Sequence, residues 1–473
     1  MIIGREKERE MLREAMRDDR SHFIAIYGRR RIGKTFLIRE TFEDRFTFQH
    51  AGLSNRGKAD QLFSFAASLK DVDYFIEKPL NNWLEAFECL KDVVRKSSEK
   101  KKIIFIDELS WMDSRNSDLL AALEHFWNGW ASARKDVVLI ICASATSWML
   151  SKVIHHKGGL YHRLTEQIQL KSFTLSECME YTQSEGFALN QEQVLQYYMI
   201  FGGVPFYWQF LRKGLSIPQN IDRIFFAPDA PLKDEYQYLY ASIFKHPEHY
   251  LQIIHALGQK KAGMTREELV ESAGVHNSGD LTMRLEELES CGFIRKYFAY
   301  GMKKKNAVYQ LVDFFTLFYL HFMDKKGPVA EDYWTLHWNN PEINTWMGLA
   351  FERVCLEHIT QIKKALGIAG IYTEVNSWYC TANLEKGIFG SQIDLLIVRQ
   401  DRVINLCEMK YSGMEFIVTE KVNRDIRKKI NDLTVSTKTK NAIYPVLITT
   451  YGLEKDSSAG IFQNVITMNA LFD

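Results

Sequence analysis

Strand-like and helix-like patterns alternate along the first third of the chain. Four short segments have the apolar character of strands: residues 23–27 (FIAIY), 46–50 (FTFQH), 103–106 (IIFI) and 137–142 (VVLIIC). Other segments repeat apolar side chains at the 3.6-residue period of a helix: residues 59–69, 83–94 and 117–131. Uninterrupted apolar strands are typical of parallel sheets covered on both faces, so this alternation predicts an α/β fold.

The pattern changes after residue 174 and becomes helical, with a turn predicted at residues 202–205 (GGVP). Three helices are then predicted at residues 249–257, 265–273 and 281–290, followed by strands at 293–299 and 307–311. The loop between these strands contains Lys303, Lys304 and Lys305. Three helices followed by a β-hairpin predict a winged helix-turn-helix. The last segment starts near residue 334 and combines a helix at 348–359 with strand-like runs at 392–398, 403–409 and 444–449.

Composition restricts the class of protein. The chain has 473 residues, of which 46% are hydrophobic and 25% charged, as in soluble globular proteins of several domains. A formal charge of +1 provides no overall attraction to nucleic acid, so any such binding must come from local patches. Seven cysteines without metal-ligand spacing predict reduced thiols. The N-terminal residues lack a signal-peptide pattern, and the apolar run 311–323 contains Asp313 and is too short for a bilayer. We therefore expect a cytoplasmic protein without a membrane segment.

A phosphate-binding loop follows the first apolar strand. Residues 28–35 match G-x-x-x-x-G-K-[ST] at every fixed position, and Phe36 opens the helix that follows. The matching residues are Gly28, Arg29, Arg30, Arg31, Ile32, Gly33, Lys34 and Thr35. The glycines allow backbone N–H groups to surround a phosphate, Lys34 supplies a charge for the β- and γ-phosphates, and Thr35 supplies a Mg²⁺ ligand. The alternative is a strand–helix turn without a ligand, which leaves Lys34 and the arginines unexplained.

Polar residues follow the next two apolar strands. Asp107 and Glu108 come after residues 103–106; we expect Asp107 to hold Mg²⁺ and Glu108 to polarise the attacking water. A solvated strand end is the alternative. Ser144 could sense the γ-phosphate or cap a helix. Arg163 could reach a phosphate in its own chain or across a subunit interface, which requires at least a dimer, or it could be a surface arginine.

Together these motifs resemble the archaeal-type ATPases, a branch of the P-loop NTPases close to AAA+ and STAND proteins. The shared segments are residues 3–8 (IGREKE), 28–35, 106–108 (IDE), 160–163 (LYHR), 202–205 and the predicted winged helix. The resemblance implies that Gly4 and Arg5 lie near the adenine. His162 and Thr146 depart from the family pattern, which affects the assignment of Arg163 more than that of the phosphate loop.

A second acidic set lies in the last segment. Glu352 falls on the apolar face of its predicted helix, Asp394 lies inside a strand-like run, and Glu408 and Lys410 are two residues apart in the next run. The pattern resembles the PD-(D/E)xK nucleases, although Ile393 replaces the proline of the motif. The resemblance implies that Asp394 and Glu408 bind Mg²⁺, that Lys410 orients the nucleophile, and that Glu352 completes the site. A retained fold without cleavage activity is the alternative. Basic residues at 421–429 could follow a phosphate backbone or form a solvated helix face.

The sequence therefore predicts four domains: a P-loop ATPase core at 1–173, a helical lid at 174–238, a winged helix-turn-helix at 239–325 and a restriction-endonuclease-like α/β domain at 334–473. The predicted function is ATP binding and hydrolysis, with Mg²⁺, by a nucleic-acid-associated protein that carries a nuclease domain. DNA is favoured over RNA, and a homo-oligomer is compatible with the sequence. The alternative is a STAND-like regulatory switch in which the winged helix and the nuclease-like domain only mediate contacts.

Overall fold

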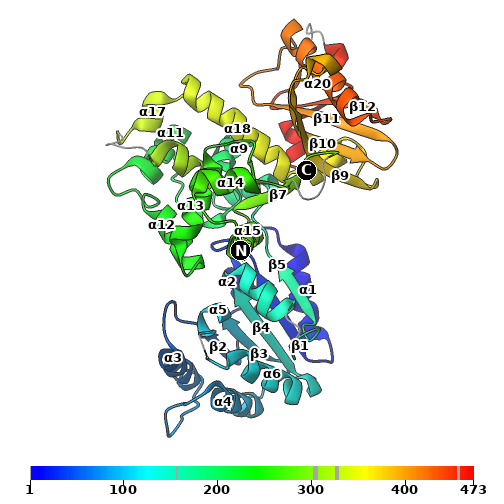
Figure 1. Ribbon diagram of the computed structural model, residues 1–473. Coiled ribbons are helices and arrows are strands. Elements are labelled where there is room, and N and C mark those ends of the chain that lie inside the picture. The colour runs from blue at the N-terminus through cyan, green and yellow to red at the C-terminus, as the bar shows by residue number, and fades with distance from the viewer. Residues whose placement is uncertain (1, 115, 156–157, 302–306, 325–329, 455–458) are drawn as a thin grey trace. The chain divides into compact units, whose positions relative to one another are not determined.

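The computed structural model describes the chain except residues 1, 115, 156–157, 302–306, 325–329 and 455–458. Its contacts divide the chain into two compact units. The first consists of Met1–Ser172 with Tyr238–Pro247, and the second of Phe173–Gln237 with Glu248–Asp473. Each unit contains its own five-stranded sheet (Figure 1). The predicted lysine-containing loop at 303–305 lies outside the described residues.

The first unit has a fully parallel sheet, which confirms the predicted α/β fold class. Its strands are β1 His22–Tyr27, β2 Phe48–Ala51, β3 Lys102–Asp107, β4 Val137–Ala143 and β5 Glu166–Gln169. They lie in the order β2-β3-β4-β1-β5, and every pair is parallel. All residues of β1 and β4 are buried, because helices cover both faces of the sheet, and this explains their uninterrupted apolar sequences.

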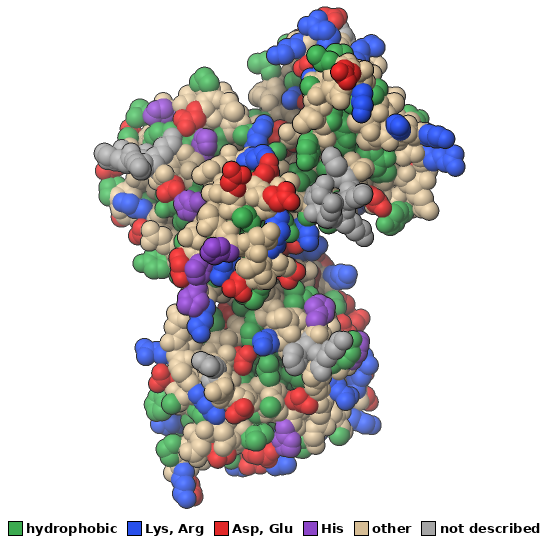
Figure 2. Space-filling model, in the orientation of Figure 1, with side chains coloured by type: hydrophobic (Ala, Val, Ile, Leu, Met, Phe, Trp, Pro, Cys, Tyr) green, Lys and Arg blue, Asp and Glu red, His purple; other side chains and the backbone are tan. Residues whose placement is uncertain are grey.

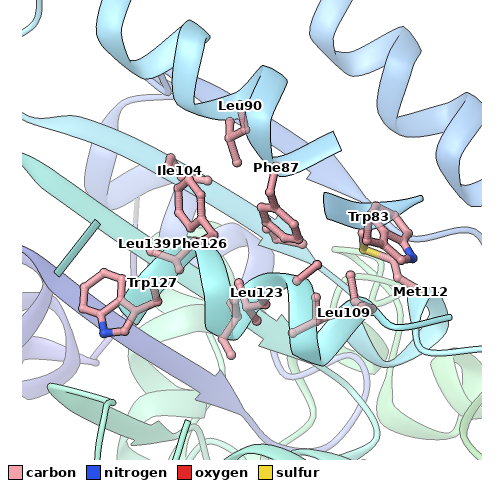
Figure 3. Packing of buried hydrophobic residues seen from close by; sticks show 14 of the residues in the cluster. Trp83, Phe87, Leu90, Ile104, Leu109, Met112, Leu123, Phe126, Trp127 and Leu139 are labelled. Atoms are coloured by element: carbon pink, nitrogen blue, oxygen red, sulfur yellow. The ribbon is translucent and has the colours of Figure 1, made fainter. Parts of the chain in front are cut away.

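Two apolar clusters attach helices to the two faces of this sheet. On one face, α1 Glu6–Arg17 and α2 Lys34–Phe42 bury Leu12, Leu37 and Ile38. On the other face lie α3 Lys58–Lys70, α4 Trp83–Lys96 and α6 Leu119–Gly129. Figure 3 shows side chains of α4 and α6 packed together with residues of β3 and β4. Burial of a large apolar side chain stabilises the fold by about 1.5–3 kcal/mol, so this cluster anchors the sheet.

The strand order of the first unit determines where its loops meet. β1 lies beside β4, and β4 lies beside β3, all in the same direction. The segments that follow these three strands therefore leave the sheet at the same edge. In open parallel sheets this edge, outside the carboxyl ends of the strands, is where ligands bind.

The second unit begins with helices and ends with a mixed sheet. α8 Leu175–Ser184 and α9 Gln191–Phe201 come first, and the predicted turn follows, because Gly202 ends α9 and Pro205 is the first residue of α10 Pro205–Trp208. Shorter helical segments follow: α11 Ile217–Ile221 and η3 Asp222–Phe226. α12 Glu235–Ile243 contains residues assigned to both units.

Three helices and a small antiparallel sheet form the middle of the second unit. The helices are α13 Pro247–Gly258, α14 Arg266–Ala273 and α15 Gly279–Ser290. The strands are β6 Met264–Thr265, β7 Ile294–Phe298 and β8 Ala307–Leu311, in the order β6-β8-β7. These elements follow the predicted order of three helices and a hairpin. The assignment as a winged helix-turn-helix remains a prediction.

The C-terminal part of the second unit contains the mixed sheet. Its strands are β9 Thr373–Cys380, β10 Ser391–Arg399, β11 Val403–Lys410, β12 Ala442–Thr449 and β13 Asn464–Thr467. β9, β10 and β11 are antiparallel neighbours, whereas β11, β12 and β13 are parallel. α20 Glu420–Thr437 packs Leu433 against Leu396 and Leu406 of this sheet. α18 Pro341–Glu357 contacts β11.

The helix α18 starts seven residues before the predicted helix at 348–359. Asn340 explains the earlier start, because its side chain accepts a hydrogen bond from the N–H of Ile343, and Pro341 occupies the first helical turn. All seven cysteines are described, and all are free thiols. None of the described helices combines the length and apolar composition that a membrane span requires.

Candidate functional site

The phosphate loop lies between β1 and α2, at the edge of the sheet where the carboxyl ends of β1, β3 and β4 meet. Gly33 caps α2 with φ 87°, and Gly28 has φ 146°; both values lie in the left-handed region that favours glycine. A Cβ atom on Gly28 would lie 2.3 Å from the carbonyl oxygen of Leu170. The two glycines of the motif are therefore required by the backbone, and at Gly28 also by a close neighbour.

Lys34 places a buried ammonium inside this loop. Its Nζ donates to the carbonyl oxygens of Gly28 and Arg29, each at 3.0 Å, and to Oγ of Ser144 at 3.1 Å. The side chain is only 5% exposed. All of these acceptors are neutral, and no carboxylate among the described residues forms an ion pair with Lys34. A buried cation without an anionic partner is costly, so the loop is suited to a phosphate.

Thr35 and Asp107 meet beside Lys34. The Thr35 hydroxyl donates to Oδ2 of Asp107 at 2.7 Å, and Oδ1 of Asp107 accepts from the N–H of Glu108 at 2.9 Å. The structure therefore brings together the two predicted Mg²⁺ ligands, one from the start of α2 and one from the end of β3. A hydroxyl and a carboxylate are oxygen ligands of the kind that Mg²⁺ binds, so these residues fit the ion.

Ser144 connects Lys34 to Glu108. Its hydroxyl donates to Oε1 of Glu108 at 2.5 Å, and its backbone N–H donates to Oε2 at 3.1 Å. Glu108 itself has φ 48°, and a Cβ on Gly52 would lie 2.7 Å from its carbonyl oxygen. The residue that caps the short helix α7 Thr146–Trp148 is Ala145, so Ser144 is not the N-cap of that helix.

The remaining predicted residues of the nucleotide site differ in their backbone conformation, contacts and burial. Gly4 and Arg5 both have positive φ, and Arg5 Nη2 donates to the carbonyl oxygen of Lys171, just beyond β5, at 2.5 Å. The guanidinium of Arg30 lies 5.8 Å from the ring centre of Trp111. Ile32 is buried, whereas Phe36 is 50% exposed. Arg31 has φ 70° and is part of the loop backbone.

Arg163 has no hydrogen bond or ion pair with the phosphate loop in the described part of the chain. It is exposed, and its backbone N–H donates to the carbonyl oxygen of Leu160. Its side chain makes no hydrogen bond or ion pair with any described residue. The adjacent His162 has φ 55°, so this segment forms a tight turn at the surface of the first unit.

The second predicted site lies on α18, β10 and β11. Leu395 pairs with Cys407, so Asp394 and Glu408 are the next residues on the two strands. The β9–β10 register shifts between Ile393 and Leu396, which indicates a β-bulge at Asp394. A bulge changes the direction in which a side chain points, and bulges are frequent next to active sites. Gln392 Nε2 donates to Oδ1 of Asp394 at 2.7 Å.

Glu352 and Asp394 interact electrostatically. Burial raises the pKa of Glu352 to about 7, and the negative charge of Asp394 contributes to the increase, while Lys261, Arg353 and Lys410 oppose it. Two carboxylates that share a site disfavour their joint ionisation, and a cation between them would relieve the repulsion. This pair therefore fits a metal ion by its charge.

Glu408 has different partners. Its Oε1 lies 2.8 Å from Nζ of Lys410, and its Oε2 lies 2.7 Å from Nζ of Lys429 on α20. Burial alone would raise the pKa of Glu408, but Lys429 and Lys410 outweigh it and lower the pKa. Sequence reasoning placed Lys429 only in a possible phosphate-binding surface, because no pattern connects it to Glu408. Among the described residues, no group of three or more His, Cys, Asp or Glu side chains is arranged to hold a metal ion.

Comparison with known proteins identifies the part of the chain that contains the first site. Residues 2–209 match a family described as an ATPase domain predominantly from Archaea. An uncharacterized protein of Methanocaldococcus jannaschii is 25% identical over 433 residues, which cover 91% of this chain and 92% of that protein. An uncharacterized ATP-binding protein of the same organism is 38% identical over 45 residues, 10% of this chain and 76% of that protein.

Among solved structures, a Walker-type ATPase of Pyrococcus abyssi matches 67% of this chain and 96% of its own length, with 16% identity and a TM-score of 0.49. The predicted resemblance to the archaeal-type ATPases is confirmed by the family match. Residues 2–209 carry an ATPase domain of this family, which is found predominantly in Archaea.

Proposed function

We propose that the protein hydrolyses Mg²⁺-ATP at the phosphate loop and that its second unit acts on nucleic acid, DNA rather than RNA, as a Mg²⁺-dependent nuclease. The observation that carries the first part is the hydrogen-bonded connection of Lys34, Ser144 and Glu108 beside the Thr35–Asp107 pair. It joins a phosphate-binding cation to a carboxylate that can polarise water.

Each residue of the first site has a role in this proposal. Lys34 neutralises charge on the β- and γ-phosphates, and the N–H groups around Gly28 and Gly33 bind phosphate oxygens. Thr35 and Asp107 would hold Mg²⁺, which neutralises charge on the transferred phosphoryl group. Glu108 orients and polarises the attacking water. Gly4 and Arg5 line the adenine pocket, and Arg163 acts on the phosphate from its own chain or from a second copy.

The nuclease part rests on Glu352, Asp394 and Lys410. The raised pKa of Glu352 beside Asp394 supports a cation site between these carboxylates. Lys410 interacts electrostatically with both of them, and its ammonium contacts Glu408. In the proposal Asp394 and Glu408 would bind Mg²⁺, which supplies charge neutralisation at the scissile phosphate. Lys410 orients the nucleophile, and Glu352 positions a ligand water.

Charge on two helices indicates where nucleic acid would bind. α20 carries the basic residues Lys421, Arg424, Arg427, Lys428 and Lys429 against the acidic Glu420, Asp425 and Asp432. Figure 2 shows basic side chains in the region where Figure 1 places α20. α15, in contrast, carries Asp280, Glu286, Glu287 and Glu289 against the single Arg284. Because phosphate contacts dominate nucleic-acid affinity, α20 is the better candidate surface, and α15 suits a protein contact.

One observation favours a second candidate, a regulatory ATPase switch without cleavage. Each oxygen of Glu408 contacts a lysine ammonium, so the charge of this carboxylate is already compensated without a metal ion. In this alternative the Glu408–Lys410–Lys429 cluster only stabilises the C-terminal sheet, and ATP turnover controls contacts with other macromolecules.

Incubation with plasmid DNA or with RNA, in the presence of Mg²⁺ or Mn²⁺ and with or without ATP, distinguishes the two candidates. The nuclease proposal expects cleavage by the wild type that is lost in Asp394→Ala and Lys410→Ala. The exposed Asp401→Ala variant is a matched control and should cleave normally. Absence of cleavage by folded wild-type protein under every metal and substrate condition would support the switch and end the nuclease proposal.

A further inference from the structure

A cavity of about 270 Å³ lies within the second unit. It is lined by residues of α9, α13 and α18, of α16 Phe314–Phe318 and of the π-helical segment Tyr319–Met323. Its walls are largely apolar and include Met199, Phe314, Leu317, Leu320, Trp346 and Ala350. A volume and lining of this kind suit the apolar body of a small molecule.

One wall of the cavity carries a buried guanidinium. Arg353 lines the cavity and is only 6% exposed. Its Nη2 donates to the carbonyl oxygen of Lys261 at 2.6 Å, and its Nε has no hydrogen-bond partner among the described residues. A buried charged group with an unused donor is costly, and an acceptor inside the cavity would satisfy it.

The charges around the cavity favour an anion. Lys260, Lys261 and Arg353 line it, and Asp324 is the single acidic residue among the described lining residues. Asp324 lies 3.5 Å from His255, and Lys260 lies 2.6 Å from Glu268, so both have partners. Lys261 has no ion-pair partner in the described structure. Among the lining residues the positive charge is therefore concentrated at Lys261 and Arg353. Glu352 and Asp394 interact electrostatically with Arg353, but neither is a lining residue.

We propose that this cavity binds a small organic anion, whose apolar body fills the space between α16 and α18 and whose carboxylate or phosphate contacts Arg353. The proposal is independent of cleavage by the second unit. It has a consequence for that site, because Arg353 and Lys261 also interact electrostatically with Glu352. An anion that engages these cations changes the charge that Glu352 experiences.

Calorimetric titration of the full chain with benzoate, benzyl alcohol and benzylamine tests the proposal, with ATP present to occupy the phosphate loop. The three probes share an aromatic ring and differ in charge. We expect benzoate to bind about tenfold more tightly than either of the others, since a charged hydrogen bond to Arg353 distinguishes it. Equal affinity for benzoate and benzylamine, or no saturable benzoate binding by folded protein, would overturn the proposal.

Variants locate the binding to this cavity. Ala350→Leu should fill the space and weaken benzoate binding by about tenfold or more, whereas Ala365→Leu, an exposed site on α19 Ile359–Ala365, should leave it unchanged. Arg353→Gln should abolish the preference for benzoate over benzyl alcohol. Because Arg353 is buried and its replacement could unfold the chain, the exposed Lys261→Gln variant provides a second measurement and should reduce the same preference. Benzoate binding that is unchanged in Ala350→Leu and Lys261→Gln would place the ligand elsewhere and refute the assignment.

Discussion

Ser144 holds both carboxylate oxygens of Glu108, one through its hydroxyl at 2.5 Å and the other through its backbone N–H at 3.1 Å. The same hydroxyl accepts a hydrogen bond from Lys34 at 3.1 Å. One side chain therefore connects the cation proposed to bind the phosphates with the carboxylate proposed to polarise the attacking water. We expect a phosphate that engages Lys34 to weaken its hydrogen bond to Ser144, and through the Ser144 hydroxyl to affect the position of Glu108.

The first prediction concerns Ser144→Ala. The variant keeps the backbone hydrogen bond to Glu108 but loses the hydroxyl that links Glu108 to Lys34. We expect kcat for ATP hydrolysis to fall by about tenfold to a hundredfold, because a misplaced catalytic group costs this much. The KM for ATP should change little, since Lys34 remains. Steady-state phosphate release measures both values. Ser151→Ala, an exposed residue of the following helical segment, should behave as wild type, and unchanged kcat in Ser144→Ala would contradict the role of the hydroxyl.

The second prediction separates binding from stability at Lys34. Lys34→Met should weaken ATP binding by roughly a hundredfold, because it removes charge-assisted hydrogen bonds to the phosphates. Without nucleotide, however, the free energy of unfolding should stay within about 1 kcal/mol of the wild-type value, since a buried ammonium bonded only to neutral oxygens adds little net stability. Urea denaturation with and without ATP measures both effects. If Lys34→Met were strongly destabilised without nucleotide and still stabilised by ATP as much as the wild type, Lys34 would have a structural role and would not bind ATP.

The third prediction compares two glycines of one motif. Gly28→Ala should lower the free energy of unfolding by about 2–4 kcal/mol, because the new Cβ meets the backbone of Leu170 at 2.3 Å in addition to the strain of φ 146°. Gly33→Ala should cost only about 1–2 kcal/mol, because nothing lies within 4 Å of its Cβ position and only the φ of 87° is unfavourable. Denaturant titration of the two variants checks the order. An equal loss in the free energy of unfolding for the two variants would mean that the loop of Gly28→Ala moves away from Leu170 and so avoids the contact.

The first site could be predicted because its information is contiguous in the sequence. β1 and β4 are buried on both faces, so their apolar runs indicated a parallel sheet directly. Gly28 to Thr35 forms a complete motif, and Asp107 and Glu108 lie at the end of a third buried strand. What the motif could not predict is the hydroxyl link through Ser144, because that contact depends on the lateral order of β4 and β3 in the sheet.

The second site was harder to predict from the sequence. Period-2 alternation predicts which strand residues share a face, but the β-bulge at Asp394 inserts an extra residue and interrupts the alternation. Lys429 reaches Glu408 from a helix 21 residues later, and only the packing of α20 on the sheet creates that contact. Arg353 is buried in α18, where a sequence pattern gives an arginine no expected partner.

The fourth prediction uses the pKa of Glu352. The pKa is raised from 4.5 to about 7 in the folded chain, mainly by burial and next by Asp394. Between these two values the unfolded chain ionises Glu352 while the folded chain keeps the proton, so folding takes up a proton and stability falls as pH rises. This loss of folding stability is absent below the unfolded pKa and complete above about pH 7, where it amounts to roughly 3 kcal/mol. Glu352→Gln should remove this slope and be the more stable protein at alkaline pH.

Denaturant titrations across this pH range measure the slope, with Glu385→Gln, an exposed substitution in the same part of the chain, as the control that should retain it. Mn²⁺ provides a further comparison. If a metal binds between Glu352 and Asp394, it favours the ionised carboxylates, so Mn²⁺ should stabilise the wild type most at high pH and stabilise Glu352→Gln less. Equal stabilisation of the two proteins by Mn²⁺ would mean that Glu352 is no part of a metal site. A wild-type slope that persists in Glu352→Gln would assign the titration to another group.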